Sequence, residues 1–193
     1  METIELSGTL GLIATVILTL NILLGMMLST AYKNKSWWQR FPEKIRSINI
    51  NDLHNYTAYV ALLFVLTHIF LIPFDPSSKF KLIDIIWPLY APHQPNIVLL
   101  GTFSLLALII VVITTQKFIK RKMSFRIWKN IHLISYATCI LFIVHGLLMD
   151  PELKDRPTDW IDAEKLLSEI CGIVLITAFA IRYKYHLSIS KNK

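Results

Sequence analysis

The sequence predicts an all-α integral membrane protein, a bundle of about five transmembrane helices and six at most. Three observations support this fold class. The 193 residues are 54% apolar and only 17% charged, whereas a soluble domain would be about a quarter charged. Long uncharged runs recur along the chain, and basic residues gather between alternate runs. The length suits a single domain over residues 1–193.

Each predicted span is an apolar run that approaches the roughly 20 residues needed to cross the hydrocarbon core of a bilayer. The third span begins near Ile97, because Pro88, Pro92 and Pro95 break the start of its uncharged run. The fifth is the weakest, since only its centre, 170–181, is free of charge. The predicted spans are 6–32, 53–74, 97–116, 131–149 and 166–185.

The distribution of charge predicts the orientation. Segments 33–46 and 117–129 and the tail 182–193 together carry 15 of the 20 basic residues, and 11 of the 13 acids lie on the opposite side. Because basic loops remain in the cytoplasm, we expect the N-terminus outside and the C-terminus inside, in a multi-pass protein of the cell inner membrane. The net charge of +7 is then an orientation signal, and we expect lipid rather than nucleic acid as a partner.

Four of the six histidines lie in two of the predicted spans, His54 and His68 on the second, His132 and His145 on the fourth. An ionisable side chain within a bilayer costs several kcal/mol unless it has a partner, so each of them is a candidate functional residue. The histidines of a pair are separated by about 20 Å of helix. Both spans run outward, which places His54 level with His132 and His68 level with His145.

Two histidines at each of two depths suit two b-type hemes, because heme iron takes one axial ligand on each face and imidazole is a common one. The sequence has no CxxCH motif, so the hemes would be bound non-covalently. The spacing poses one difficulty. Thirteen residues from His132 to His145 correspond to a rotation of about 140° from one face, so either the helix is locally distorted or its hemes approach different flanks.

The spacings His54-x13-His68 and His132-x12-His145, with the stretch RIWKNIHLISY at 126–136, resemble the ferric-reductase-like transmembrane domain family. That family includes ferric reductases and the heme core of NADPH oxidases. The resemblance covers a core of 52–148 and its unequal histidine spacings match the family pattern. It implies that the four histidines are axial ligands of two hemes that pass electrons across the membrane.

The chain departs from the family in two respects. Six spans are usual and we find five, and the sequence has no GxGxxG motif for a nicotinamide or flavin domain. It is similar to stand-alone members, such as the heme subunit that supplies a periplasmic methionine-sulfoxide reductase. We therefore expect a di-heme subunit rather than a self-contained enzyme. Its donor would be a separate flavoprotein, flavin or quinol, and its acceptor an extracytoplasmic molecule or partner reductase.

Anionic heme propionates favour basic partners at each membrane surface. Candidates for the inner heme are Arg46, Arg126 and Lys129; those for the outer heme are Lys79, Lys81, Lys154 and Arg156. We expect His93 to be a surface-loop residue, His186 to be solvated in the basic tail, and Cys139 and Cys171 to be packing residues.

Two other functions fit part of the pattern. A small transporter could use membrane histidines to carry protons or bind a transition metal, but no acidic residue lies mid-span to share the protons. A membrane anchor that only holds other subunits in place, without redox chemistry, would need no histidines at matching depths, so the observed pattern does not favour it. An absorption spectrum separates the three functions, because only the heme protein shows a Soret band that shifts on reduction.

Overall fold

Five long helices dominate the computed structural model, which describes residues 3–149 and 163–191. All five are long and apolar enough to cross a membrane, the last of them over Lys165–Tyr185, so the predicted all-α bundle with five spans is confirmed. Those two ranges contain no strand. The long helices are α1 (Thr3–Leu28), α4 (Ile50–Leu71), α6 (Pro95–Thr115), α8 (Phe125–Leu148) and α9 (Ala163–Lys191).

The helices begin where the sequence supplies a cap. The Asn49 side chain accepts hydrogen bonds from the first-turn amides of α4, and the Ser124 hydroxyl accepts one from the Ile127 amide of α8 at 3.3 Å. Pro95 occupies the first turn of α6, where its missing N–H would have no intrahelical partner. The helix therefore begins two residues before the Ile97 that the proline pattern suggested.

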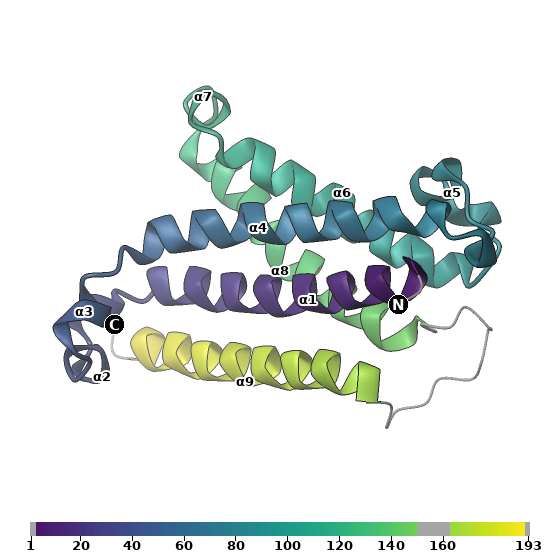
Figure 1. Ribbon diagram of the computed structural model, residues 1–193. Helices are drawn as coiled ribbons and strands as arrows, with labels where there is room; N and C mark the ends of the chain where they lie inside the picture. Colours follow the sequence, from purple (N-terminus) through teal and green to yellow (C-terminus); the bar gives the residue numbers. More distant parts are fainter. Residues whose placement is uncertain (1–2, 150–162, 192–193) are drawn as a thin grey trace.

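Short helices join the spans at the two ends of the bundle (Figure 1). The end with the C-terminus carries α2 (Ser36–Gln39), α3 (Glu43–Arg46) and α7 (Lys117–Lys120), and the N-terminus lies at the opposite end near α5 (Leu82–Ile86). The two basic segments thus share one end, as their charges required. We call this end inner and the other outer, following the predicted orientation. Around α5 lie η2 (Ile72–Phe74), η3 (Pro76–Ser78) and η4 (Pro88–Tyr90), and η1 (Tyr32–Asn34) follows α1.

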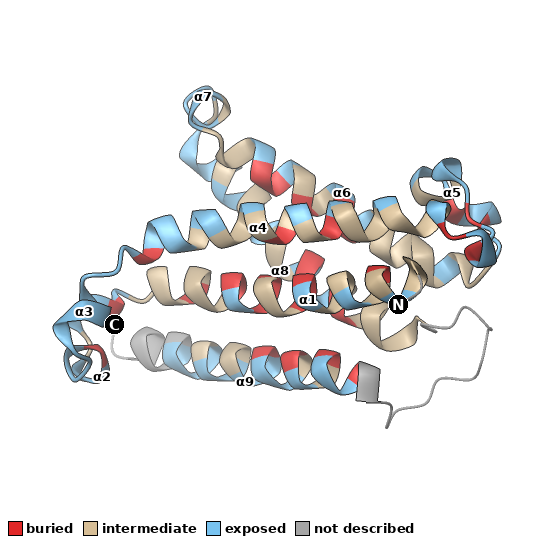
Figure 2. Ribbon diagram, in the orientation of Figure 1, coloured by how far each residue is buried: buried red, intermediate tan, exposed pale blue. Residues whose placement is uncertain are grey.

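The spans pack as two antiparallel pairs with a fifth helix alongside. The most extensive contacts join α1 to α4 and α6 to α8, and α9 packs against α1 and α8. In Figure 1, α1 lies between α4 and α9. Buried residues lie mainly on the faces turned toward neighbouring helices (Figure 2). Large apolar side chains such as Leu63 and Ile176 are exposed. In a bilayer such outward apolar faces contact lipid.

An apolar layer crosses the middle of the bundle. All four paired helices contribute to it, and it consists of Ala14, Leu18, Ala61, Val65, Leu105, Leu108, Val112 and Phe142. Each of these residues is at least nine-tenths buried. The layer separates the inner half of the bundle from the outer half.

At the outer end, Asp75 fastens the loop after α4 to the start of α1. Its carboxylate accepts a hydrogen bond from the Ile4 amide at 2.9 Å and bonds from the Ser77 amide and hydroxyl at 2.9 and 2.6 Å. The bond from the Ser77 hydroxyl, together with the amide bonds, lowers the pKa of Asp75 below its usual value. A carboxylate suits this position because the first-turn amides of α1 have no intrahelical acceptor.

Candidate functional site: two stacked histidine pairs

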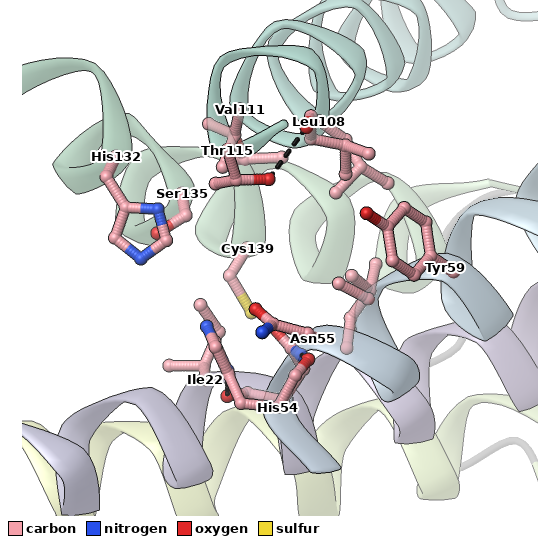
Figure 3. Close-up of a pocket in the computed structure, with 15 residues that line it drawn as sticks. Ile22, His54, Asn55, Tyr59, Leu108, Val111, Thr115, His132, Ser135 and Cys139 are labelled. Atoms are coloured by element: carbon pink, nitrogen blue, oxygen red, sulfur yellow. Dashed lines mark hydrogen bonds between the residues drawn. The ribbon is translucent and has the colours of Figure 1, made fainter. Parts of the chain in front are cut away.

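The inner site is formed by His54 of α4 and His132 of α8. Their ring centroids lie 6.0 Å apart with an interplanar angle of 76°. Both rings line a cavity with an empty volume of about 640 Å³, its open mouth included, to which α1, α4, α6 and α8 all contribute. In Figure 3 the two histidines approach this cavity from different helices.

The outer site is formed by His68 of α4 and His145 of α8. Both line a second cavity, with an empty volume of about 860 Å³ including its mouth. The loop between α4 and α6 covers part of this cavity through Phe80 and Ile85. The structure thus brings the histidines together in the two depth-matched pairs that their spacing predicted.

The apolar layer lies between the two cavities. Leu18, Leu108 and Val112 line the inner cavity. Val65, Leu105 and Phe142 line the outer one. The two histidine pairs therefore face a shared wall of buried aliphatic and aromatic side chains.

The spacing of His132 and His145 does not require a broken helix. Helix α8 is continuous from Phe125 to Leu148. In a regular helix 13 residues rotate the side-chain direction by about 140°, yet both rings line cavities to which α1, α4, α6 and α8 all contribute. Of the two alternatives that the sequence left open, a break in this helix is therefore excluded.

Three of the four imidazoles are anchored by the helix behind them. The Nδ1 of His54 donates to the Asn21 carbonyl at 3.0 Å, and that of His68 donates to the Ser7 carbonyl at 2.7 Å. On the other side of the bundle, Nδ1 of His145 donates to the Ile97 carbonyl at 2.8 Å. A carbonyl oxygen can only accept, so Nδ1 carries the hydrogen and the lone pair of Nε2 is left free to bind a metal.

Two polar side chains of α1 reinforce these anchors. The Ser7 hydroxyl donates to the His68 carbonyl at 2.8 Å and lies 3.0 Å from His68 Nδ1. The Asn21 amide donates to the His54 carbonyl and to the Thr57 hydroxyl. Sequence reasoning missed both residues. The available signal was that Ser7 and Asn21 are polar residues in an uncharged span, 14 apart like His54 and His68.

His132 is held differently from the other three. Its Nδ1 is buried, and no hydrogen-bond partner for it exists among the described residues. Its ring stacks on Trp128, with centroids 5.1 Å apart and planes inclined by 17°. The ammonium of Lys120 lies 3.8 Å from the centroid of the Trp128 ring. A buried polar atom without a partner costs about 1–3 kcal/mol, so this histidine is the least well satisfied of the four.

A pair of facing imidazoles can hold one metal ion between them. Bonds of about 2 Å on either side place the two nitrogens about 4 Å apart and the ring centroids about 6 Å apart, close to the inner pair's separation. The described residues contain no group of three or more histidine, cysteine or acidic side chains suited to a metal. The remaining ligands would therefore have to come with the metal, as they do in a porphyrin. The separation of the inner pair fits this group, and the outer pair likewise lines one cavity.

Among the residues that the structure describes, the basic residues predicted to contact propionates do not line either cavity. Arg126 and Lys129 are exposed, and Arg46 is exposed and donates from Nη1 to Gln39 Oε1 at 3.0 Å. At the outer end Lys79 and Lys81 are exposed as well. Lys154 and Arg156 lie outside the described residues. The propionate contacts stay a prediction.

The remaining candidates lie away from the histidine pairs or among packing residues. His93 contacts the Phe80 ring at 6.3 Å between centroids. The side chain of His186 lies outside the described part of the chain. Cys139 and Cys171 are free, buried thiols in one apolar cluster, and Cys139 also lines the inner cavity.

Comparison with known proteins gives one family match. The model described as ferric reductase like transmembrane component matches residues 10–143, which is more than half of the chain. The matched region contains His54, His68 and His132, and His145 lies two residues beyond it. No curated protein and no solved structure matches the chain.

Proposed function

Because the chain belongs to the ferric reductase like transmembrane family, whose members form membrane heme cores for electron transfer, we propose that it is a di-heme electron-transfer subunit. His54 and His132 would hold the inner b-type heme, and His68 and His145 the outer one. When bound, each heme would supply a one-electron couple at its own depth in the membrane.

The observation that carries this proposal is the anchoring of the histidines. Metal-binding histidines almost always donate their second ring N–H to a carbonyl or carboxylate, which fixes both the tautomer and the ring orientation. Three of the four rings do so here, His54 and His68 to backbone carbonyls of α1 and His145 to one of α6. A histidine that only packed within the bundle would not need its Nδ1 tied to a carbonyl and its Nε2 left free beside a second histidine.

The chain's own residues would control the access of substrates to the irons and the direction of electron transfer. Two imidazoles on each iron would leave no open coordination position, so substrate chemistry would take place at a heme edge or in a partner. The buried residues of the apolar layer would limit the access of water and ions to the space between the sites. Electrons would enter at the inner pair from a flavoprotein, flavin or quinol. They would leave at the outer pair toward an extracytoplasmic acceptor or partner reductase.

The test is to purify the full chain in detergent and measure its heme and protein content. Two hemes per chain are expected, with a Soret band that shifts on reduction. Acid-acetone should extract both hemes, because no attachment motif is present. Folded protein with almost no heme would overturn the proposal and favour a transporter or an anchor.

A further inference from the structure

Helix α1 repeats one arrangement at two depths. Ser7 and Asn21 accept the Nδ1 hydrogens of its two histidine partners, and Gly11 and Gly25 follow them by four residues each. Both intervals, from serine to asparagine and from glycine to glycine, are 14 residues. Fourteen residues advance a helix by about 21 Å and return within about 40° of the same face. The same face of α1 therefore serves both cavities.

The glycines allow each ring to reach its carbonyl. A Cβ at Gly25 would lie 3.1 Å from His54 Cε1, and one at Gly11 would lie 3.2 Å from His68 Cε1 and Nδ1. Both separations are tighter than ordinary Cβ contacts, so an alanine would push the imidazole away from the helix backbone.

Helix α6 shows this arrangement at the outer depth only. Ile97 accepts the hydrogen bond from His145, and Gly101, four residues later, lies against that ring, where a Cβ would be 2.9 Å from His145 Cε1. Another 14 residues lead to Val111 and Thr115, which both line the inner cavity with His132. Thr115 thus occupies the position where the other three sites have glycine.

The inner carbonyls of α6 also have another donor. The Thr114 hydroxyl donates to the Val111 carbonyl at 3.0 Å and to the Ile110 carbonyl at 2.9 Å. Because the histidines of α8 are 13 residues apart rather than 14, Ile110 is the other candidate acceptor for His132. The residue four positions after Ile110 is Thr114, so a threonine replaces glycine in either register.

The unanchored His132 ring is consistent with this difference. Figure 3 shows His132, Val111 and Thr115 on one side of the inner cavity, with His54 on the other. The Nδ1 of His132 is buried without a partner among the described residues. Stacking on Trp128 orients the ring but offers it no acceptor.

We propose that Gly11, Gly25 and Gly101 are positioning residues that admit three ligands to backbone carbonyls, and that Thr115 denies this anchor to His132. The inference rests on the proposed heme function. It makes the two sites unequal: two anchored imidazoles at the outer heme, one at the inner. An imidazole that donates Nδ1–H to a carbonyl is a more basic ligand and favours ferric iron. Thr115 therefore raises the reduction potential of the inner heme.

The first test compares Thr115→Gly with Thr115→Ala in a redox titration of the full, heme-loaded chain. Thr115→Gly removes Cβ and should shift one heme to a lower potential, whereas Thr115→Ala keeps Cβ and should shift neither. The shifted heme should be the one whose spectrum changes in His54→Ala. Equal shifts in the two variants, or none in either, would overturn the inference.

The second test compares Gly25→Ala with Gly172→Ala, whose added Cβ would meet only an ordinary contact with Ile143 at 3.5 Å. Gly25→Ala should weaken retention of the inner heme by about tenfold or more and leave the outer heme bound. Circular dichroism checks that both variants remain helical. Equal heme retention in the two variants contradicts the inference, even if the wild type holds two hemes. A heme-free wild type would instead refute the function on which the inference rests.

Discussion

At the scale of single residues, the surroundings of each imidazole decide which ring nitrogen is left to bind metal. A carbonyl on the neighbouring helix holds Nδ1 of His54, His68 and His145, so their Nε2 atoms are available. This constraint is independent of the family match, because it follows from the tautomer alone.

Loss of a ligand should affect the hemes by depth rather than by helix. We expect His54→Ala and His132→Ala to remove the same spectral and redox component, and His68→Ala and His145→Ala to remove the other. The reason is that histidines on one helix are about 20 Å apart, whereas nitrogens across one iron are about 4 Å apart. Heme-resolved redox titrations of the four variants provide the measurement.

Double variants that remove both histidines of one pair, His54 with His132 or His68 with His145, provide the control for this pairing. Within one pair, a second substitution should cost little beyond the first, since the interaction is already lost. If His54→Ala and His68→Ala removed one component together, the pairing by depth would be wrong.

The hydrogen bonds of Asp75 predict how the stability of the protein changes in acid. The Ser77 hydroxyl chiefly lowers the pKa of Asp75 in the folded protein. The ionised carboxylate therefore contributes fully to the free energy of unfolding above the ordinary aspartate pKa of about 3.9. That contribution is lost as the pH falls through the lowered pKa of the folded state. Asp75→Asn turns an acceptor for the Ile4 amide into a donor. The variant should therefore have a lower Tm than the wild type near neutral pH.

The pH series supplies the control for that variant. The difference in Tm between wild type and Asp75→Asn should narrow below about pH 3.9, when the wild-type carboxylate takes up a proton. Thermal unfolding in one detergent at several pH values measures it. A constant difference across the series would mean that the charge of Asp75 does not contribute.

At the scale of helices, the five spans and the two histidine pairs were predictable because they depend on hydropathy, spacing and the common direction of two helices. The anchors were not, because they require the register of α1 against α4 and of α6 against α8. In the sequence, Gly11 and Gly25 have no evident role, and only the structure shows that His68 lies against Gly11 and His54 against Gly25. The role of Thr115 could not be read from the sequence for the same reason.

The two ends of the bundle predict accessibility to a labelling reagent. Lys122→Cys lies at the inner end beside α7, and Lys81→Cys lies at the outer end beside α5; both native side chains are exposed. A membrane-impermeant maleimide added to intact cells should label Lys81→Cys and spare Lys122→Cys. The native thiols of Cys139 and Cys171 are buried and provide a low background. The reverse labelling pattern would invert the predicted orientation.

At the scale of the whole molecule, the bound hemes should hold the two helix pairs together. Both cavities are lined by α1, α4, α6 and α8, so ligands in them would bridge the α1/α4 pair and the α6/α8 pair. A ligand that binds only the folded state stabilises it by about 2.7 kcal/mol at a hundredfold excess over Kd.

Protein made in cells blocked in heme synthesis should therefore unfold at a lower temperature than the loaded protein. Scanning fluorimetry of both preparations in the same detergent measures the difference. Reconstitution with heme should restore the higher Tm. An identical Tm with verified loading would show that the four helices associate without help from the cofactor.

The apolar layer between the cavities has an electrical consequence. Its eight residues carry no ionisable side chain, so an electron that passes from the inner to the outer heme would move without a proton carried by this layer. The histidine levels are about 20 Å apart in a hydrocarbon core of about 30 Å, so the step spans about two-thirds of the membrane voltage. Moving one charge across the full thickness is worth about 2.3 kcal/mol per 100 mV. In the predicted orientation, a negative cell interior would therefore drive the electron outward. The energised membrane would itself be part of the driving force.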